Sequence, residues 1–95
     1  MFGPVLVVQT YAGVDDTIAV ANDTAYGLAA GVFGVDPDRT ESVAWRLRAG
    51  QVEINGGAFN PAAPFGGIKQ SGLGREGSRH GAEDYLEMKY ICLSV

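Results

Sequence analysis

The sequence predicts a small α/β fold in which parallel strands alternate with helices. Apolar runs typical of strands alternate with segments of helical character, giving the order strand, helix, strand, helix, strand, long loop, helix, strand. Alternation of this kind is typical of a layered fold with parallel pairing. The chain has 95 residues, of which 46% are hydrophobic and 19% charged, so we expect one small globular domain with a thin stability margin.

The N-terminal part predicts a strand, a helix and a second strand. Residues 5–11 begin with a continuous apolar run rich in β-branched residues, which is typical of a strand buried on both faces. A helix is expected over residues 15–22, because Asp15 and Asp16 lie where acidic side chains stabilise a helix N-terminus. Residues 28–33 are apolar and bounded by turns, so they predict a buried strand.

The middle of the chain predicts its most regular helix, over residues 37–49. Asp36 is a suitable N-cap, and Pro37 is tolerated in the first turn. Gly50 follows at the position of a C-terminal stop. Residues 51–55 then alternate between polar and apolar, which predicts a third strand.

The C-terminal third predicts a loop, a short helix and a last strand. Residues 56–71 form a long segment without a regular pattern, and such loops are more often functional than accidental. A helix is expected over residues 78–86, with Ser78 as a possible N-cap. Residues 89–95 predict a terminal strand.

A glycine-rich stretch, residues 64–76, organises this part of the chain. Glycine permits positive φ and lets one backbone segment approach another closely, so we expect a shaped loop instead of a linker. Residues 72–77 also match G-x-G-x-x-G, which indicates dinucleotide binding only between a strand and a helix of a βαβ unit. The preceding residues do not read as a strand, so we reject this interpretation.

Composition excludes several classes of partner. The net charge is −4 and the sequence contains no cluster of Lys and Arg, which argues against nucleic acid. The apolar runs fall far short of the about 20 residues that a membrane helix needs. The N-terminus lacks signal-peptide features and Cys92 is the single cysteine, so no internal disulfide is possible and a cytoplasmic location is expected.

Short motifs distributed along the chain are recognisable as a set. They are Phe2-Gly3-Pro4-Val5, Ala21-Asn22-Asp23-Thr24, Tyr26-Gly27-Leu28-Ala29-Ala30, Ala49-Gly50, Ile54-Asn55, Pro64-Phe65-Gly66-Gly67-Ile68-Lys69, Ser71-Gly72 and Gly74-Arg75-Glu76. In this order and spacing the sequence resembles the C-terminal part of an NAD(P)-dependent aldehyde dehydrogenase. Each motif alone would be weak, but together they cover essentially the whole chain.

The resemblance implies a fold and a reaction. Residues 1–87 would supply the end of a catalytic domain, as a partial parallel sheet with flanking helices. Residues 88–95 would be an oligomerisation strand. Enzymes of this family oxidise an aldehyde to a carboxylic acid with NAD or NADP. A cysteine thiolate attacks the aldehyde, hydride passes to the nicotinamide, and a glutamate activates water.

The family's catalytic groups lie upstream of the matching segment. The nucleophilic cysteine, the base glutamate, the oxyanion asparagine and the cofactor domain have no counterpart here. We therefore expect a C-terminal fragment of a longer enzyme, without catalytic residues, inactive alone and binding no cofactor. The alternative is a stand-alone, non-catalytic interaction module that pairs with intact subunits. The aldehyde and the choice of NAD or NADP depend on residues that are not in this sequence.

The resemblance assigns three aromatic residues to ligand sites. Phe2 occupies the position that packs near the nicotinamide, although it also fits an ordinary apolar residue entering a strand. Phe65 corresponds to an aromatic that lines the substrate tunnel, and the residue type suits a pocket. Anchoring the loop in the core is an equal alternative for Phe65. Phe59 is a further substrate-pocket candidate in a loop of variable length.

Two polar residues are candidates for active-site support. Asn55 ends the strand at 51–55, where it would hold the floor of the active site by bonding the loop backbone. Asparagine at a strand end is also a common turn former, and we favour this structural role. The resemblance implies that Glu76 supports the active-site hydrogen-bond network.

The remaining candidates belong to a subunit interface. The resemblance places Arg75 and Glu87 there, against the alternative of two solvated surface charges. Tyr90, Ile91 and Leu93 would contribute to the terminal strand that adds to a neighbouring subunit. Because an exposed apolar strand invites edge pairing, we expect self-association of the isolated chain, or pairing with other subunits of the family.

Cys92 and His80 are reactive residue types for which we predict no chemistry. Reactive cysteines need an electropositive, partly exposed site, whereas Cys92 lies in an apolar strand with Lys89 as its one basic neighbour. His80 is the only histidine and has no cysteine nearby, so a metal site is not expected.

Overall fold

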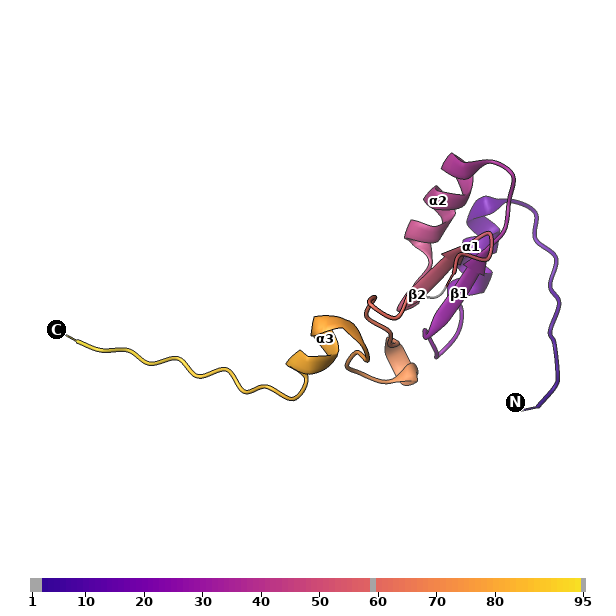
Figure 1. Cartoon of the computed structure of the whole chain (residues 1–95). Helices are drawn as coiled ribbons and strands as arrows, with labels where there is room; N and C mark the ends of the chain where they lie inside the picture. The colour runs from indigo at the N-terminus through magenta and orange to yellow at the C-terminus, as the bar shows by residue number, and fades with distance from the viewer. Residues whose placement is uncertain (1–2, 59, 95) are drawn as a thin grey trace.

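Two parallel strands joined by a helix form the centre of the protein (Figure 1). The computed structural model describes residues 3–58 and 60–94. Strands β1 (Ala29–Val32) and β2 (Gln51–Ile54) pair in register from Ala29 opposite Gln51 to Val32 opposite Ile54. Helix α2 (Pro37–Arg46) connects them, and α1 (Val14–Asn22) precedes them. The predicted parallel pairing across a crossover helix is confirmed.

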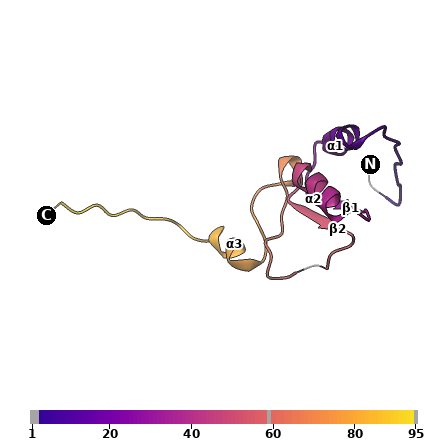
Figure 2. The ribbon, with the colours of Figure 1, turned by 90° about the horizontal axis from the view of Figure 1, so that it is seen from above.

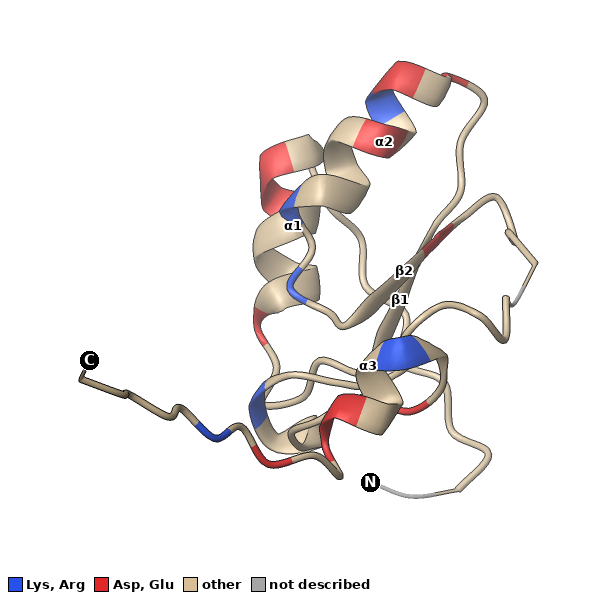
Figure 3. Ribbon diagram, turned by 60° about the vertical axis from the view of Figure 1, so that its left-hand side comes forward, with Lys and Arg blue, Asp and Glu red and all other residues tan. Residues whose placement is uncertain are grey.

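The two helices begin for the reasons that the sequence suggested. The Asp36 carboxylate accepts a hydrogen bond from the backbone N–H of Arg39 at 3.1 Å, and Pro37 occupies the first turn of α2. Helix α1 carries Asp15 and Asp16 in its first turn and buries Ile18, which is only 6% exposed. The two helices lie next to each other, and α2 packs against both strands (Figure 3).

Helix α2 ends at Arg46, before the predicted end at residue 49. The backbone N–H of Leu47 bonds back to Ala44, which tightens the last turn. Beyond it, the Arg46 carbonyl accepts from the side chain of Asn22, and the Arg48 N–H donates to the same side chain. A partner from α1 thus replaces the hydrogen bonds that would have continued the helix toward Gly50.

The chain after β2 is mostly loop. A 3-10 turn (Lys69–Ser71) and helix α3 (Ser78–Glu83) are its regular elements among the described residues. Helix α3 is shorter than the predicted 78–86, and Gly77 takes the N-cap position expected for Ser78. Ser78 itself has a φ of 52°, and its hydroxyl accepts from the N–H of His80.

The strands expected at residues 5–11 and 89–95 are not formed in the described part of the chain. Residues 5–11 and 87–94 run as extended backbone, and the C-terminal segment projects away from the body (Figures 1 and 2). A strand is stable only when its N–H and C=O groups pair with a neighbouring strand. Neither segment has such a neighbour among residues 3–58 and 60–94, so the prediction from apolar pattern alone is wrong here.

The protein exposes far more surface than a folded chain of its mass normally does. Its accessible area is 8183 Å², against about 5,200 Å² expected for a compact monomer of this size. The radius of gyration is 17.9 Å, where about 12 to 13 Å is typical. Large apolar side chains such as Leu6 and Leu93 are more than four-fifths exposed. The fold therefore presents apolar faces that this chain does not cover.

The charged side chains are dispersed over the helices and the tail (Figure 3). None of the described helices combines the length and the apolar character needed to cross a bilayer.

Candidate functional site

The glycine-rich stretch folds into a loop that closes on itself between Phe65 and Glu76. These two residues form an antiparallel bridge, with N···O distances of 2.9 Å from Phe65 to Glu76 and 2.6 Å in the reverse direction. Phe65 is half-buried, whereas Glu76 is exposed. The segment before residue 72 is a 3-10 turn and not a strand, which confirms the rejection of a dinucleotide-binding fingerprint.

Arg75 stabilises this loop by hydrogen bonds to its backbone. Its Nη1 atom donates to the carbonyl oxygens of Gly67 at 2.9 Å and Gly74 at 2.7 Å. Its backbone N–H donates to the carboxylate of Asp84 at 3.0 Å, which ties the loop to the end of α3. In this chain Arg75 thus holds backbone, and a role at a subunit interface stays a prediction.

Two glycines allow the loop to press against the start of β2. A Cβ on Gly50 would overlap the carbonyl of Gly66, and a Cβ on Gly66 would lie 2.5 Å from the carbonyl oxygen of Gly74. In both cases the contacted atoms belong to the backbone, which cannot move aside as a flexible side chain would. The expectation that glycine permits close backbone approach in this stretch is confirmed at these positions.

Gly27 is the junction at which the loop meets the sheet. Its carbonyl oxygen accepts hydrogen bonds from the N–H groups of Gly50 and Ile68, each at 3.0 Å. Its own N–H donates to the hydroxyl of Ser71 at 2.9 Å. One buried glycine therefore joins the segment leading into β1, the start of β2 and the glycine-rich loop.

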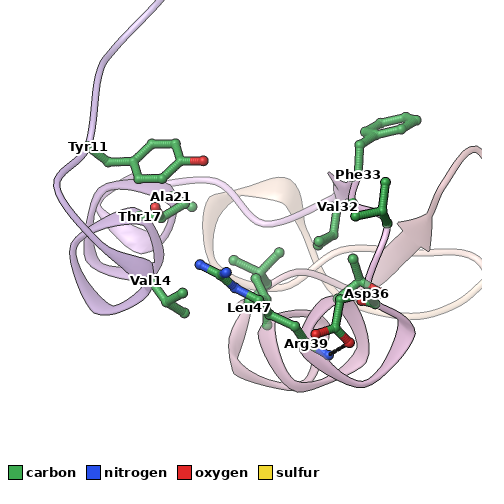
Figure 4. A pocket seen from close by; sticks show the side chains of 14 residues that line it. Tyr11, Val14, Thr17, Ala21, Val32, Phe33, Asp36, Arg39 and Leu47 are labelled. Carbon is green, nitrogen blue, oxygen red and sulfur yellow. Dashed lines mark hydrogen bonds between the residues drawn. The ribbon is translucent and has the colours of Figure 1, made fainter.

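Two grooves border these elements. The smaller, of about 240 Å³, runs beside β2 and includes Phe65, Pro64 and Ile54 in its lining. The larger, of about 480 Å³, lies between α1, β1 and α2 (Figure 4). There the Arg39 side chain extends toward Leu47, whereas the ring of Phe33 points away from the groove.

Asn55 sits where β2 ends and has a φ of 52°. Its Oδ1 accepts from the N–H of Gly34 and its Nδ2 donates to the carbonyl of Gly34, both at 2.9 Å. The side chain thus bonds backbone, as expected, but at the end of β1 and not within the glycine-rich loop. A role in holding the floor of an active site stays a prediction.

The structure does not gather the other predicted residues at one site. Glu87, Tyr90, Ile91 and Leu93 all lie exposed in the extended C-terminal segment. Phe2 and Phe59 fall outside the described residues, so their roles stay predictions from the sequence.

The residues set aside as unreactive are both at the surface. Cys92 is exposed in the extended segment. Nδ1 of His80 lies 3.1 Å from Oε2 of Glu83, and both side chains are well exposed. Across the described ranges, no three His, Cys, Asp or Glu side chains are placed to share a metal ion.

Sequence reasoning missed a contact between Lys69 and the end of α1. Lys69 Nζ donates to the carbonyl oxygens of Asn22 at 3.1 Å and Thr24 at 3.0 Å. Both partners lie in the motif Ala21-Asn22-Asp23-Thr24, and Lys69 ends the motif that begins at Pro64. Both motifs were recognisable in the sequence, but nothing in the sequence indicated that they contact each other.

Comparison with known proteins places the chain in a family. A sequence profile described as the aldehyde dehydrogenase family matches residues 1–91. The chain belongs to the aldehyde dehydrogenase family. The resemblance drawn from the dispersed motifs is thereby confirmed.

Curated relatives match the chain over nearly its whole length. A Sinorhizobium fredii protein named as a probable NADP(+) succinate-semialdehyde dehydrogenase is 52% identical over 93 residues, which are 97% of this chain and 19% of the relative. The chain thus spans about a fifth of the length of the curated aldehyde dehydrogenases it matches, and it aligns with their C-terminal part.

Solved structures of aldehyde dehydrogenases share its fold. Aldehyde dehydrogenase C of Pseudomonas syringae, crystallised with NAD+ and octanal, is 55% identical with a TM-score of 0.86. The match covers 90% of this chain and 18% of that one. Betaine aldehyde dehydrogenase of Staphylococcus aureus is 43% identical with a TM-score of 0.88, over 94% of this chain and 18% of that one. The predicted fold class is confirmed.

Proposed function

We propose that this chain acts as the C-terminal part of an NAD(P)-dependent aldehyde dehydrogenase, which oxidises an aldehyde to a carboxylic acid. In this role it supplies two sheet strands, the glycine-rich loop and a terminal segment for oligomerisation. The chemistry itself belongs to the rest of the enzyme. The isolated 95 residues do not turn over aldehyde and bind neither NAD nor NADP.

The uncovered apolar surface supports this proposal most directly. Residues 5–8 are all apolar and exposed, and their backbone has no strand partner within the described part of the chain. Burial of apolar area stabilises a fold by about 25 cal/mol per Å², so such surfaces are normally covered. The remaining four-fifths of an aldehyde dehydrogenase is a body large enough to cover them.

The proposal gives the named residues their roles in the complete enzyme. Phe65 and Phe59 face the aldehyde, and Phe2 packs near the nicotinamide. Asn55 and Glu76 support the active site. The interface between subunits takes Arg75, Glu87, Tyr90, Ile91 and Leu93. The groove beside β2 supports the assignment of Phe65, because this ring forms part of its lining.

The location and assembly state belong to the same proposal. We assign the enzyme to the cytoplasm and expect it to be an oligomer whose subunits meet at the terminal segment. The rival function is a stand-alone module that pairs with intact aldehyde dehydrogenase subunits. The exposed apolar residues of the terminal segment would serve either role, so experiment decides between them.

Two measurements test the proposal. The first is the mass of the endogenous polypeptide that carries this sequence. A chain of several hundred residues supports the enzyme role, whereas a 10.0 kDa chain supports the interaction module. The second is the aldehyde-dependent reduction of NAD(P)+ by that endogenous polypeptide and by the purified 95 residues. We expect activity in the former and none in the latter. Activity of the 95 residues alone would overturn the proposal.

A further inference from the structure

Lys69 binds the C-terminal end of α1 from a position 47 residues beyond Asn22. Its ammonium group donates to the carbonyls of Asn22 and Thr24, and the Asn22 contact is partly buried. The last carbonyls of a helix lack partners within the helix and carry a partial negative charge. Helix α1 has no basic side chain in its last turn, so Lys69 supplies the missing cation from the glycine-rich loop.

Asn22 extends the same contact to α2. Its Nδ2 atom donates to the carbonyl of Arg46 at 3.0 Å, and its Oδ1 atom accepts from the N–H of Arg48 at 2.7 Å. Asn22 therefore bonds Lys69 with its backbone and the end of α2 with its side chain. Through Asn22, one set of hydrogen bonds therefore connects Lys69 with the ends of both helices.

The backbone on both sides of Lys69 is hydrogen-bonded to the segment between α1 and β1. Lys69 has a φ of 57°, a conformation that residues other than glycine rarely adopt. On either side of it, the N–H of Ile68 bonds Gly27 and the N–H of Gln70 bonds Ala25 at 2.9 Å. The two carbonyl contacts of Nζ add to these backbone hydrogen bonds around a residue in an unfavourable conformation.

We propose that Lys69 is a positioning residue that sets the depth of Phe65 in the aldehyde pocket by fastening the glycine-rich loop to α1. The part concerning the pocket rests on the proposed function. Lys69 touches neither reacting atoms nor substrate and acts through Phe65 in the same loop. Loss of the fastening lets the loop move outward, so the enzyme binds aldehyde less well while its chemical step is preserved.

The test is a graded series in the intact polypeptide that carries this sequence. Lys69→Met keeps the length of the side chain and removes charge and donors, Lys69→Gln keeps one amide donor, and Lys69→Arg keeps both charge and donors. Arg79→Met is the matched control, because it removes an exposed cation that makes no side-chain hydrogen bond or ion pair within residues 3–58 and 60–94. The two readouts are hydrogen exchange of the Ile68 and Gln70 amides, and steady-state kinetics.

We expect Lys69→Met to speed exchange of both amides by about tenfold or more, since two hydrogen bonds from a charged donor are lost. The KM for aldehyde should rise about tenfold with kcat within about twofold, which is the signature of lost binding shared by ground and transition states. The KM for NAD(P)+ should not change. Lys69→Gln should be intermediate, and Lys69→Arg should recover most of the loss.

Unchanged exchange in Lys69→Met, or equal effects in Lys69→Met and Arg79→Met, would overturn the fastening. Faster exchange with an unchanged KM for aldehyde would overturn the positioning of Phe65. If Lys69→Met does not fold, Lys69→Gln against Lys69→Arg decides the same points. If the unaltered polypeptide oxidises no aldehyde, the proposed function fails, and the exchange readout still decides whether Lys69 fastens the loop.

Discussion

Asn55 and Gly34 join the ends of the two strands through a pair of hydrogen bonds, each 2.9 Å long. Gly34 follows β1 and Asn55 follows β2, so the pair lies at the carboxyl edge of the parallel sheet. Ligands of open α/β sheets bind at this edge. The pair therefore fixes the positions of the two strand ends relative to each other.

Replacing Asn55 should lower the stability of the intact polypeptide. Asn55→Ala removes both hydrogen bonds and puts a residue with a poor tolerance of positive φ at 52°, so we expect a loss of about 2 kcal/mol in the free energy of unfolding. Asn55→Gly keeps the backbone conformation and should lose only about half as much. Urea unfolding measures both, and an equal loss in the two variants would contradict the separate contribution of the backbone.

Adding a methyl group at Gly50 should be severely destabilising. Its Cβ would overlap the Gly66 carbonyl, and both are backbone positions packed together. We expect Gly50→Ala to cost about 3 kcal/mol or more, or to prevent folding. Gly13→Ser is the control, because no atom lies within 4 Å of its Cβ and serine is favoured at the N-cap. Thermal unfolding of both variants checks the contrast, which a small effect at Gly50 would contradict.

The ion pair between Arg46 and Asp15 should contribute less than the neighbouring Asn22. The pair is 2.7 Å long, but its side chains are 47% and 89% exposed, so solvent screens the attraction. We expect Asp15→Asn to cost less than about 0.5 kcal/mol and Asn22→Ala about 1 to 2 kcal/mol, since the latter removes two hydrogen bonds to the backbone of Arg46 and Arg48. Denaturant unfolding at low and high salt distinguishes them. A larger, salt-dependent loss at Asp15 would reverse the order.

The isolated 95 residues should self-associate through the terminal segment. Ile91 and Leu93 are 71% and 83% exposed in an extended backbone, which is a template for edge pairing. Introducing Ile91→Lys together with Leu93→Lys should reduce the association, because charged side chains block such pairing. Ser94→Lys is the control for charge alone. Sedimentation velocity across a concentration series provides the readout, and a concentration-independent monomer of the unaltered chain would refute the prediction.

Local features that depend on neighbouring residues were predicted well. The start of α2 follows from Asp36 and Pro37, whose capping geometry is set by residues within one turn. Its end was misplaced because Asn22, from another helix, takes over the hydrogen bonds at Arg46 and Arg48. Periodicity within a segment carries no information about a partner that is distant along the chain.

The local features of the candidate site were likewise predictable from the sequence, whereas its long-range contacts were not. The motif Pro64 to Lys69 marked the glycine-rich loop as a shaped element, and the close approach of Gly50 and Gly66 confirms this reading. Lys69 went unnoticed, because only the folded chain brings its ammonium group to the carbonyls of Asn22 and Thr24. An ordinary lysine in a loop gives no sign that its partner is a helix end.

The sequence by itself determined the family and the parallel α/β pattern, since these depend on residue order and local backbone preference. Tertiary structure decided which apolar segments became strands. Residues 29–32 and 51–54 pair with each other, whereas residues 5–8 and 89–94, equally apolar in pattern, remain extended and exposed. The physical reason is that a strand's hydrogen bonds belong to its neighbour, so a strand exists only where a second strand is available to pair with it.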